Sequence, residues 1–143
     1  MKKLLTMITA ILMMFMVFTA CDGGLSNSSD KESEYLTMVK NTQVMLDEYA
    51  DDIYRCWYDY VYEDEYWSVN AALAAAANLN KDNILIIESN NDAIKDLYKS
   101  VKEGKYQLEV KEVMQAYNDY YSFVMEVSGS FQSFSADKEK LKK

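Results

Sequence analysis

The stretch "YRCWYDYVYEDEYW", residues 54–67, places seven aromatic rings among acidic side chains and the chain's only arginine. Four of the tyrosines recur at every fourth position, a spacing that aligns side chains along one side of a helix. These four are Tyr54, Tyr58, Tyr62 and Tyr66. Such a ladder can bind a glycan, a peptide, an amphiphile or a protein partner. Alternatively, Phe131 and Phe134 in the last segment of the chain can cover it.

Arg55 completes this set of candidate binding residues. Asp51 precedes it by four residues and Asp59 follows it by four, a spacing typical of surface ion pairs on a helix. Beside the tyrosines, the guanidinium could also hold a carboxylate or phosphate group of a ligand. The consecutive acidic residues 63–65 would point in different directions on a helix, so we expect no metal site there.

The side chains needed for catalysis are scarce in this sequence. It has no histidine, no phosphate-binding glycine loop and no Cys-x-x-Cys motif. The acidic residues fall at positions expected to face solvent on helices. We therefore expect a protein that is not an enzyme and that uses no cofactor.

The first 21 residues, "MKKLLTMITAILMMFMVFTAC", combine two lysines, an apolar run and small residues before a cysteine. This pattern predicts a secretory signal peptide. Its end, "FTAC", resembles the lipobox of bacterial lipoproteins, with Phe18 where leucine or valine is usual. The resemblance implies cleavage after residue 20 and acylation of Cys21, for example by palmitate. The expected organisation is a signal peptide (1–20), a lipidated cysteine with a flexible tether (21–29) and one helical domain (30–143).

Removing Lys2 and Lys3 with the signal peptide would leave 13 basic and 23 acidic side chains, a net charge of about −10. A surface of this charge repels nucleic acid. With Cys21 acylated, Cys56 would have no partner for a disulfide within the chain. We expect it to be a small buried side chain, or, if exposed, to link two copies.

Apolar residues recur along the chain at alternating spacings of four and three, which is typical of helices packed as in coiled coils. The pattern predicts helices over 31–66, 69–103 and 106–127, and a short helix after the "SGS" at 128–130. In the first helix, the expected core positions include Ile53, Trp57, Tyr60 and Trp67. The predicted fold is all-α, an antiparallel bundle of three long helices with a short fourth C-terminal helix.

The segment "NLNKDN", residues 78–83, leaves two possibilities open for the second helix. The chain can break there, with Asp82 capping a new helix, because buried asparagines on the packed face are costly. Alternatively the helix is continuous, which would make the first two helices nearly equal in length. We favour the continuous helix.

The text "NNDAIKDLYKSVKEGKYQ", followed by "AYNDYYSFVMEVSGSFQSFSADKEKLKK", resembles a group of small lipoproteins of low-GC Gram-positive bacteria. The resemblance covers about the last third of the chain and implies an extracytoplasmic helical bundle without transferring any site residue. Together these features predict a lipoprotein anchored on the extracytoplasmic face of the membrane, acting as a protein-interaction module of the cell envelope. The partner would be an envelope protein or a second copy. A ligand binder that uses the tyrosine ladder is the alternative.

Overall fold

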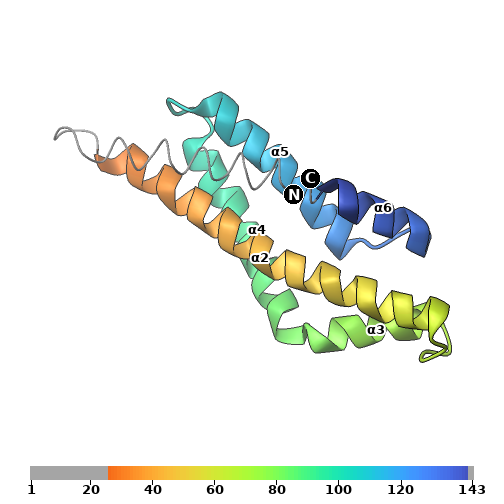
Figure 1. Cartoon of the computed structure of the whole chain (residues 1–143). Coiled ribbons are helices and arrows are strands. Elements are labelled where there is room, and N and C mark those ends of the chain that lie inside the picture. Colours follow the sequence, from red (N-terminus) through yellow and green to blue (C-terminus); the bar gives the residue numbers. More distant parts are fainter. Residues whose placement is uncertain (1–25, 142–143) are drawn as a thin grey trace.

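The computed structural model describes residues 26–141, and this part of the chain consists of helices joined by short loops (Figure 1). The helices are α2 (Ser26–Tyr62), α3 (Val69–Leu79), α4 (Lys81–Val101), α5 (Gln107–Met125) and α6 (Phe131–Leu141). No strand occurs among the described residues, so the predicted all-α class is confirmed. None of the described helices is long and apolar enough to cross a bilayer.

Helix α2 extends along the whole molecule, and each of the other four helices packs against it (Figure 1). Helix α4 runs in the opposite direction, because Tyr35 lies beside Tyr98 while Thr42, further along α2, accepts a hydrogen bond from Asn90. Helix α3, which precedes α4 in the chain, begins this return path along the C-terminal half of α2. The α2 helix therefore acts as the common support for the rest of the fold.

Helices α5 and α6 divide the length of α2 between them. Tyr35 donates a hydrogen bond to the carbonyl of Val110, and Tyr120 donates one to Asp47, so α5 runs in the same direction as α2 along its N-terminal half. Helix α6 turns back along the C-terminal half, where its first residue, Phe131, lies against the last turns of α2. The end of α2 is consequently covered by α3 and α6.

The prediction of one continuous helix over 69–103 is wrong. Asn80 separates α3 from α4, and the two helices meet at a sharp bend (Figure 1). The Asn80 amide donates to Asp52 at 2.8 Å and to the carbonyl of Ala76 at 3.1 Å. These bonds satisfy the buried amide of Asn80 at the bend. The alternative interpretation expected the break but also expected Asp82 to cap the new helix, and this second part is wrong: Asn80 occupies the cap position and Asp82 lies in the first turn of α4.

The boundaries of the first helix also differ from the prediction of 31–66. Helix α2 begins at Ser26, so the last four residues of the expected tether are helical, and it ends at Tyr62. Asp64 has a left-handed backbone (φ 53°), and the side chain of Ser68 accepts a hydrogen bond from the backbone of Ala71 to cap α3. Trp67 lies in this turn and is 89% exposed, so its predicted core position is wrong.

The core is built from the faces that the helices turn toward α2. It combines apolar residues with buried tyrosines and the small Ala72 and Ala76 of α3. Ile53 and Trp57 are buried there, as the spacing predicted, and Tyr60 is partly buried. Cys56 is also buried, as expected for a small side chain. The largest fully buried side chains are Tyr35, Tyr117, Tyr120, Leu36, Leu46, Ile53, Ile87 and Ile94.

Candidate functional site

Three tyrosines form a continuous row of rings on the last turns of α2, and we call this row the tyrosine strip. The ring centroids of Tyr54 and Tyr58 are 6.3 Å apart, and those of Tyr58 and Tyr62 are 4.7 Å apart. The spacing of four residues produces this arrangement, because successive side chains then overlap along one side of the helix.

Tyr66 is not part of the strip, contrary to the prediction. Since α2 ends at Tyr62, Tyr66 follows the turn and its hydroxyl donates to the Sγ of Cys56 at 3.7 Å. This hydrogen bond raises the pKa of the Tyr66 phenol above its usual value. Tyr66 therefore covers a buried thiol instead of extending the row of exposed rings.

Phe131 lies against all three rings of the strip. Its ring centroid is 5.3 Å from Tyr54, 6.2 Å from Tyr58 and 5.9 Å from Tyr62. The strip is nevertheless only partly covered, since Tyr58 is 38% exposed and Tyr62 is 57% exposed. The structure thus combines the two alternatives left open by the sequence: α6 supports the strip from one side, and the outer rings face solvent.

A cluster of aromatic rings fixes Phe131 in this position. Trp57, which is buried, lies 6.1 Å from Phe131 and 5.8 Å from Phe134, measured between ring centroids. Phe134 in turn stacks on Phe123 of α5 at 4.8 Å. Because these rings join α2, α5 and α6, the strip rests on a packed base.

Lys138 of α6 places its ammonium over the first ring of the strip. Its Nζ lies 4.5 Å from the centroid of Tyr54 and also forms an ion pair with Asp51. The lysine side chain is 9% exposed, whereas the side chain of its partner Asp51 is 57% exposed. Burial of the lysine strengthens its contact with the Tyr54 ring, but water still reaches the carboxylate and weakens the ion pair.

The spacing suggested that Arg55 pairs with Asp51 and Asp59, but the structure shows neither ion pair. Its guanidinium pairs with Asp52 at 2.8 Å, one turn back along α2. Asp52 also accepts the hydrogen bond from Asn80, which draws it toward α3. Arg55 remains 61% exposed, so this pair contributes little to stability. No contact places Arg55 against the rings of the strip within the described residues.

The exposed end of the strip is bordered by acidic side chains. Glu63, Asp64 and Glu65 are exposed in the turn after α2, and Asp59 is half-buried beside them. None of these four carboxylates forms an ion pair with a lysine or arginine of residues 26–141. The same part of the chain contains no cluster of His, Cys, Asp or Glu suited to a metal ion.

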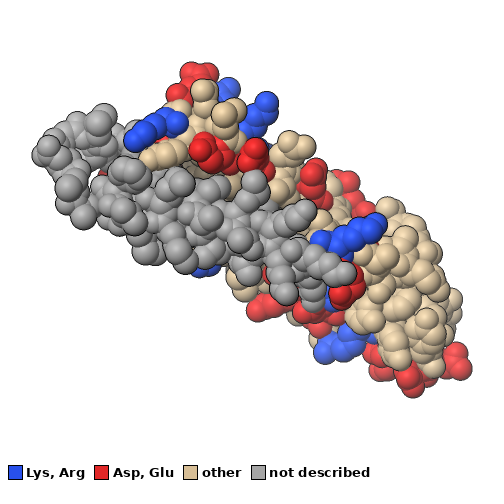
Figure 2. Space-filling view, turned by 45° about the horizontal axis from the view of Figure 1, so that its top comes forward, with Lys and Arg blue, Asp and Glu red and all other residues tan. Residues whose placement is uncertain are grey.

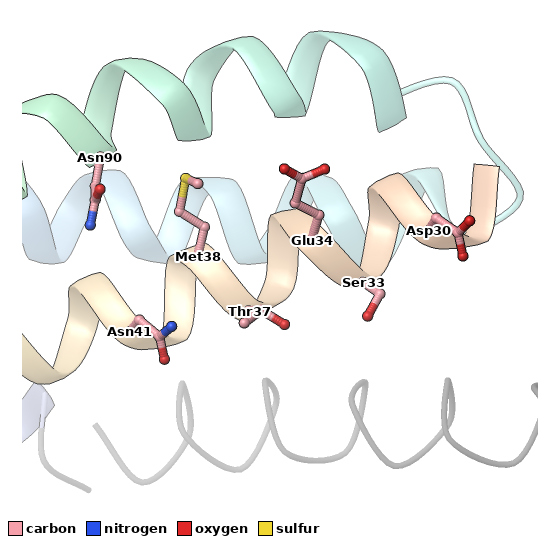
Figure 3. Close-up of a pocket in the computed structure, with 7 residues that line it drawn as sticks. All are labelled: Asp30, Ser33, Glu34, Thr37, Met38, Asn41 and Asn90. Atoms are coloured by element: carbon pink, nitrogen blue, oxygen red, sulfur yellow. The ribbon is translucent and has the colours of Figure 1, made fainter. Parts of the chain in front are cut away.

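A separate hollow of about 470 Å³ lies along the N-terminal half of α2. Figure 3 shows Met38 and Glu34 directed toward α4, whereas Ser33, Thr37 and Asn41 project from another side of α2. Asn90 of α4 reaches the same hollow and donates a hydrogen bond to Thr42. Most of the lining residues are polar or charged, and none of them carries an aromatic ring like those at the other end of α2.

Sequence reasoning did not find two contributors to the site. Lys138 belongs to a basic run at the C-terminus, and only the return of α6 along α2 brings it to Tyr54. Trp67 was assigned to the core because it continues the apolar spacing past the end of α2. The residues "EDE" before it, which are poor candidates for burial, were the available signal for that end.

Cys21, the predicted lipidation site, lies outside the described residues. Comparisons with protein-family models, with curated proteins and with solved structures found no match for this chain. The geometry of the tyrosine strip is therefore the principal basis for a functional proposal.

Proposed function

We propose that this protein is a lipid-anchored, non-enzymatic interaction module on the extracytoplasmic face of the membrane, and that the tyrosine strip contacts its partner. The anchor is Cys21, acylated after removal of residues 1–20. The domain is a helical bundle in which α3 and α4 together form the second of three long segments and α6 is the short fourth. The partner is an envelope protein or a second copy of the chain.

The exposed aromatic rings at the C-terminal end of α2 carry this proposal. Tyr58 and Tyr62 face solvent although Phe131, itself packed on Trp57, supports them from one side, and Trp67 is exposed in the turn that follows. Partly exposed rings fixed on a rigid base lose little conformational entropy on binding. Tyrosine and tryptophan are also enriched among the residues that dominate binding energy at interfaces.

The test is co-purification from detergent-solubilised native membranes with a Tyr58→Ser, Tyr62→Ser double variant of the full chain. We expect a partner that accompanies the wild-type protein to be lost. A matched control, Leu85→Ser with Ile86→Ser, removes two exposed apolar side chains of α4 away from the strip and should retain the partner. Both proteins are compared by circular dichroism so that an unfolded variant is recognised.

Retention of every partner by the strip variant would contradict the proposal, as would equal loss in the control. The alternative function, binding of a glycan, peptide or amphiphile by the strip, makes a different prediction. In that case the protein partners persist in the double variant, and only binding of the soluble ligand is lost.

A further inference from the structure

The first ring of the tyrosine strip already binds a cation within the protein. The Lys138 ammonium lies 4.5 Å from the centroid of the Tyr54 ring and is balanced by the Asp51 carboxylate. A tyrosine face attracts a cation through its quadrupole, and a nearby carboxylate adds Coulombic attraction. This end of α2 therefore combines the two groups needed to hold a positively charged side chain.

The next two rings of the strip, Tyr58 and Tyr62, face solvent and could also attract a cation. Tyr58 and Tyr62 are 38% and 57% exposed, and within residues 26–141 no lysine or arginine lies over either ring. Phe131 occupies their other side, with its centroid 6.2 and 5.9 Å away. Tyr58 lies between Tyr54 and Tyr62, with ring centroids 6.3 and 4.7 Å away, so Tyr62 at the end of the strip is the ring most open to a cation supplied from outside.

One carboxylate repeats the acidic half of the Lys138 arrangement. Asp59 precedes Tyr62 by three residues, the same spacing as that between Asp51 and Tyr54. The backbone N–H of Glu63 donates to the carbonyl of Asp59 at 3.0 Å, so the helical path continues through this pair. Asp59 consequently lies on the same side of α2 as Tyr62, and Glu63 lies one turn beyond Asp59.

The surface around Asp59 and Glu63 is also negatively charged. Glu63, Asp64 and Glu65 are exposed at this end, whereas the nearby cations Arg55 and Lys138 already have carboxylate partners. In the view of Figure 2, the end of the molecule formed by the end of α2 and the start of α3, at the right, shows acidic and uncharged atoms without lysine or arginine. An acidic surface of this kind attracts a basic partner and speeds its association.

We propose that Tyr58 and Tyr62, with Asp59 and Glu63, bind the cationic side chains of a basic polypeptide segment. This inference rests on the proposed function, because it assigns the chemistry of the partner that the strip contacts. Tyr62 and Asp59 receive one arginine or lysine, as Tyr54 and Asp51 receive Lys138, and Tyr58 and Glu63 extend the aromatic and the acidic surface around them. Arginine is favoured, because its planar guanidinium stacks on an aromatic ring while donating hydrogen bonds to a carboxylate.

The test uses the full-length chain in detergent and a fluorescent peptide that alternates arginine and glycine. A peptide of the same length with glutamine in place of arginine is the neutral control. We expect the arginine peptide alone to bind, and its affinity to fall as the salt concentration rises. Tyr62→Leu should weaken binding by about 3- to 10-fold, whereas Tyr62→Phe, which keeps the ring, should leave it nearly unchanged.

Separate variants test the role of the carboxylates. Asp59→Asn with Glu63→Gln should weaken binding of the arginine peptide, whereas Glu112→Gln, which removes an exposed carboxylate from α5, should not. Equal weakening by Tyr62→Leu and Tyr62→Phe would overturn the role of the ring. Equal binding of the arginine and glutamine peptides would overturn the proposal as a whole.

These outcomes are distinguishable from failure of the proposed function. If the Tyr58→Ser, Tyr62→Ser variant loses its partner from native membranes but the wild-type chain does not bind the arginine peptide, the strip is an interaction surface for a partner of other chemistry. The proposed function would then stand, and the inference of a basic segment would be wrong.

Discussion

Glu32 is a buried acidic side chain in a protein whose other carboxylates mostly face solvent. It is 3% exposed, and its Oε1 has no hydrogen-bond partner within the described residues. A Cβ added at Gly104 would lie 2.6 Å from this oxygen, which shows how closely α2 approaches the turn between α4 and α5. Burial raises the pKa of the Glu32 carboxyl, and the positive charge of Lys105 opposes the shift only in part.

The first prediction follows from the sign of this shift. A carboxyl whose pKa is higher in the folded than in the unfolded state binds more protons when folded, so its contribution favours folding at acidic pH. That contribution is lost as the pH rises from the ordinary value of 4.5 through the raised value. Replacing Glu32 by Gln should therefore raise the thermal midpoint at pH 7 and leave it almost unchanged at pH 4.

Thermal unfolding followed by circular dichroism at the two pH values measures this effect. Glu34→Gln is the matched control, because Glu34 is exposed two residues away and its replacement should leave the midpoint nearly constant at pH 7. A lower midpoint of Glu32→Gln at pH 7 would contradict the prediction, since the charged carboxylate would then stabilise the fold.

Individual core residues at the strip were predictable where the helix itself was predicted correctly. Ile53 and Trp57 are buried because they lie on the face of α2 that the spacing identified, and Cys56 is buried beside them. Trp67 continues the same spacing yet is 89% exposed, because the chain leaves the helix after Tyr62. Periodicity specifies a face only as long as the helix continues, and local polar residues determine where it ends.

At the scale of elements, the break between α3 and α4 shows what the spacing of apolar residues cannot reveal. The spacing passes through residues 78–83 without a shift, although its positions there are Asn80 and Asn83, and one helix was favoured because it would nearly match the first helix in length. The decisive interaction is tertiary: buried Asn80 donates to Asp52 of α2, twenty-eight residues away. Single-residue propensities do not identify this partner, so the sequence left two alternatives, and the break, which was less favoured, is correct.

Helix α6 was predicted correctly as a short C-terminal helix, but the interaction that holds it on α2 was not. Lys138 contacts both Asp51 and Tyr54 with a side chain that is 9% exposed. We predict that Lys138→Met lowers the free energy of unfolding by about 1 kcal/mol, because Tyr54 loses its cation and the ion pair with the 57% exposed Asp51 is removed. Urea unfolding followed by circular dichroism measures the change.

Lys140→Met supplies the control for this prediction. Lys140 pairs with Asp137 on the same helix and is 75% exposed, so its loss should cost no more than about 0.5 kcal/mol. If the two variants were equally stable, the contacts of Lys138 would not hold α6 in place. The aromatic rings Phe131 and Phe134 would then be sufficient to fix that helix.

At the scale of the whole molecule, the length of α2 separates its N-terminal end, which follows the proposed lipid anchor, from its C-terminal end, which carries the tyrosine strip. From Ser26 to Tyr58 the helix spans about 48 Å at 1.5 Å per residue. Cys21 precedes the start of α2 by five residues, whereas the tyrosine strip occupies the opposite end. With a lipid on Cys21, the strip would be held away from the anchored end on a helix that the other four helices support.

The last prediction tests that anchor with the chain's two cysteines. Cells are labelled with an alkyne analogue of palmitate, and the full-length protein is then isolated from membrane and soluble fractions. Cys21→Ser should abolish the label, because the thiol that carries the acyl group is removed. Cys56→Ser should retain it, because Cys56 is 1% exposed beneath Tyr66 and the signal segment is unchanged. Undiminished labelling of Cys21→Ser would refute the lipid anchor, whereas loss of label in that variant alone would place the acyl chain at the end of α2 remote from the strip.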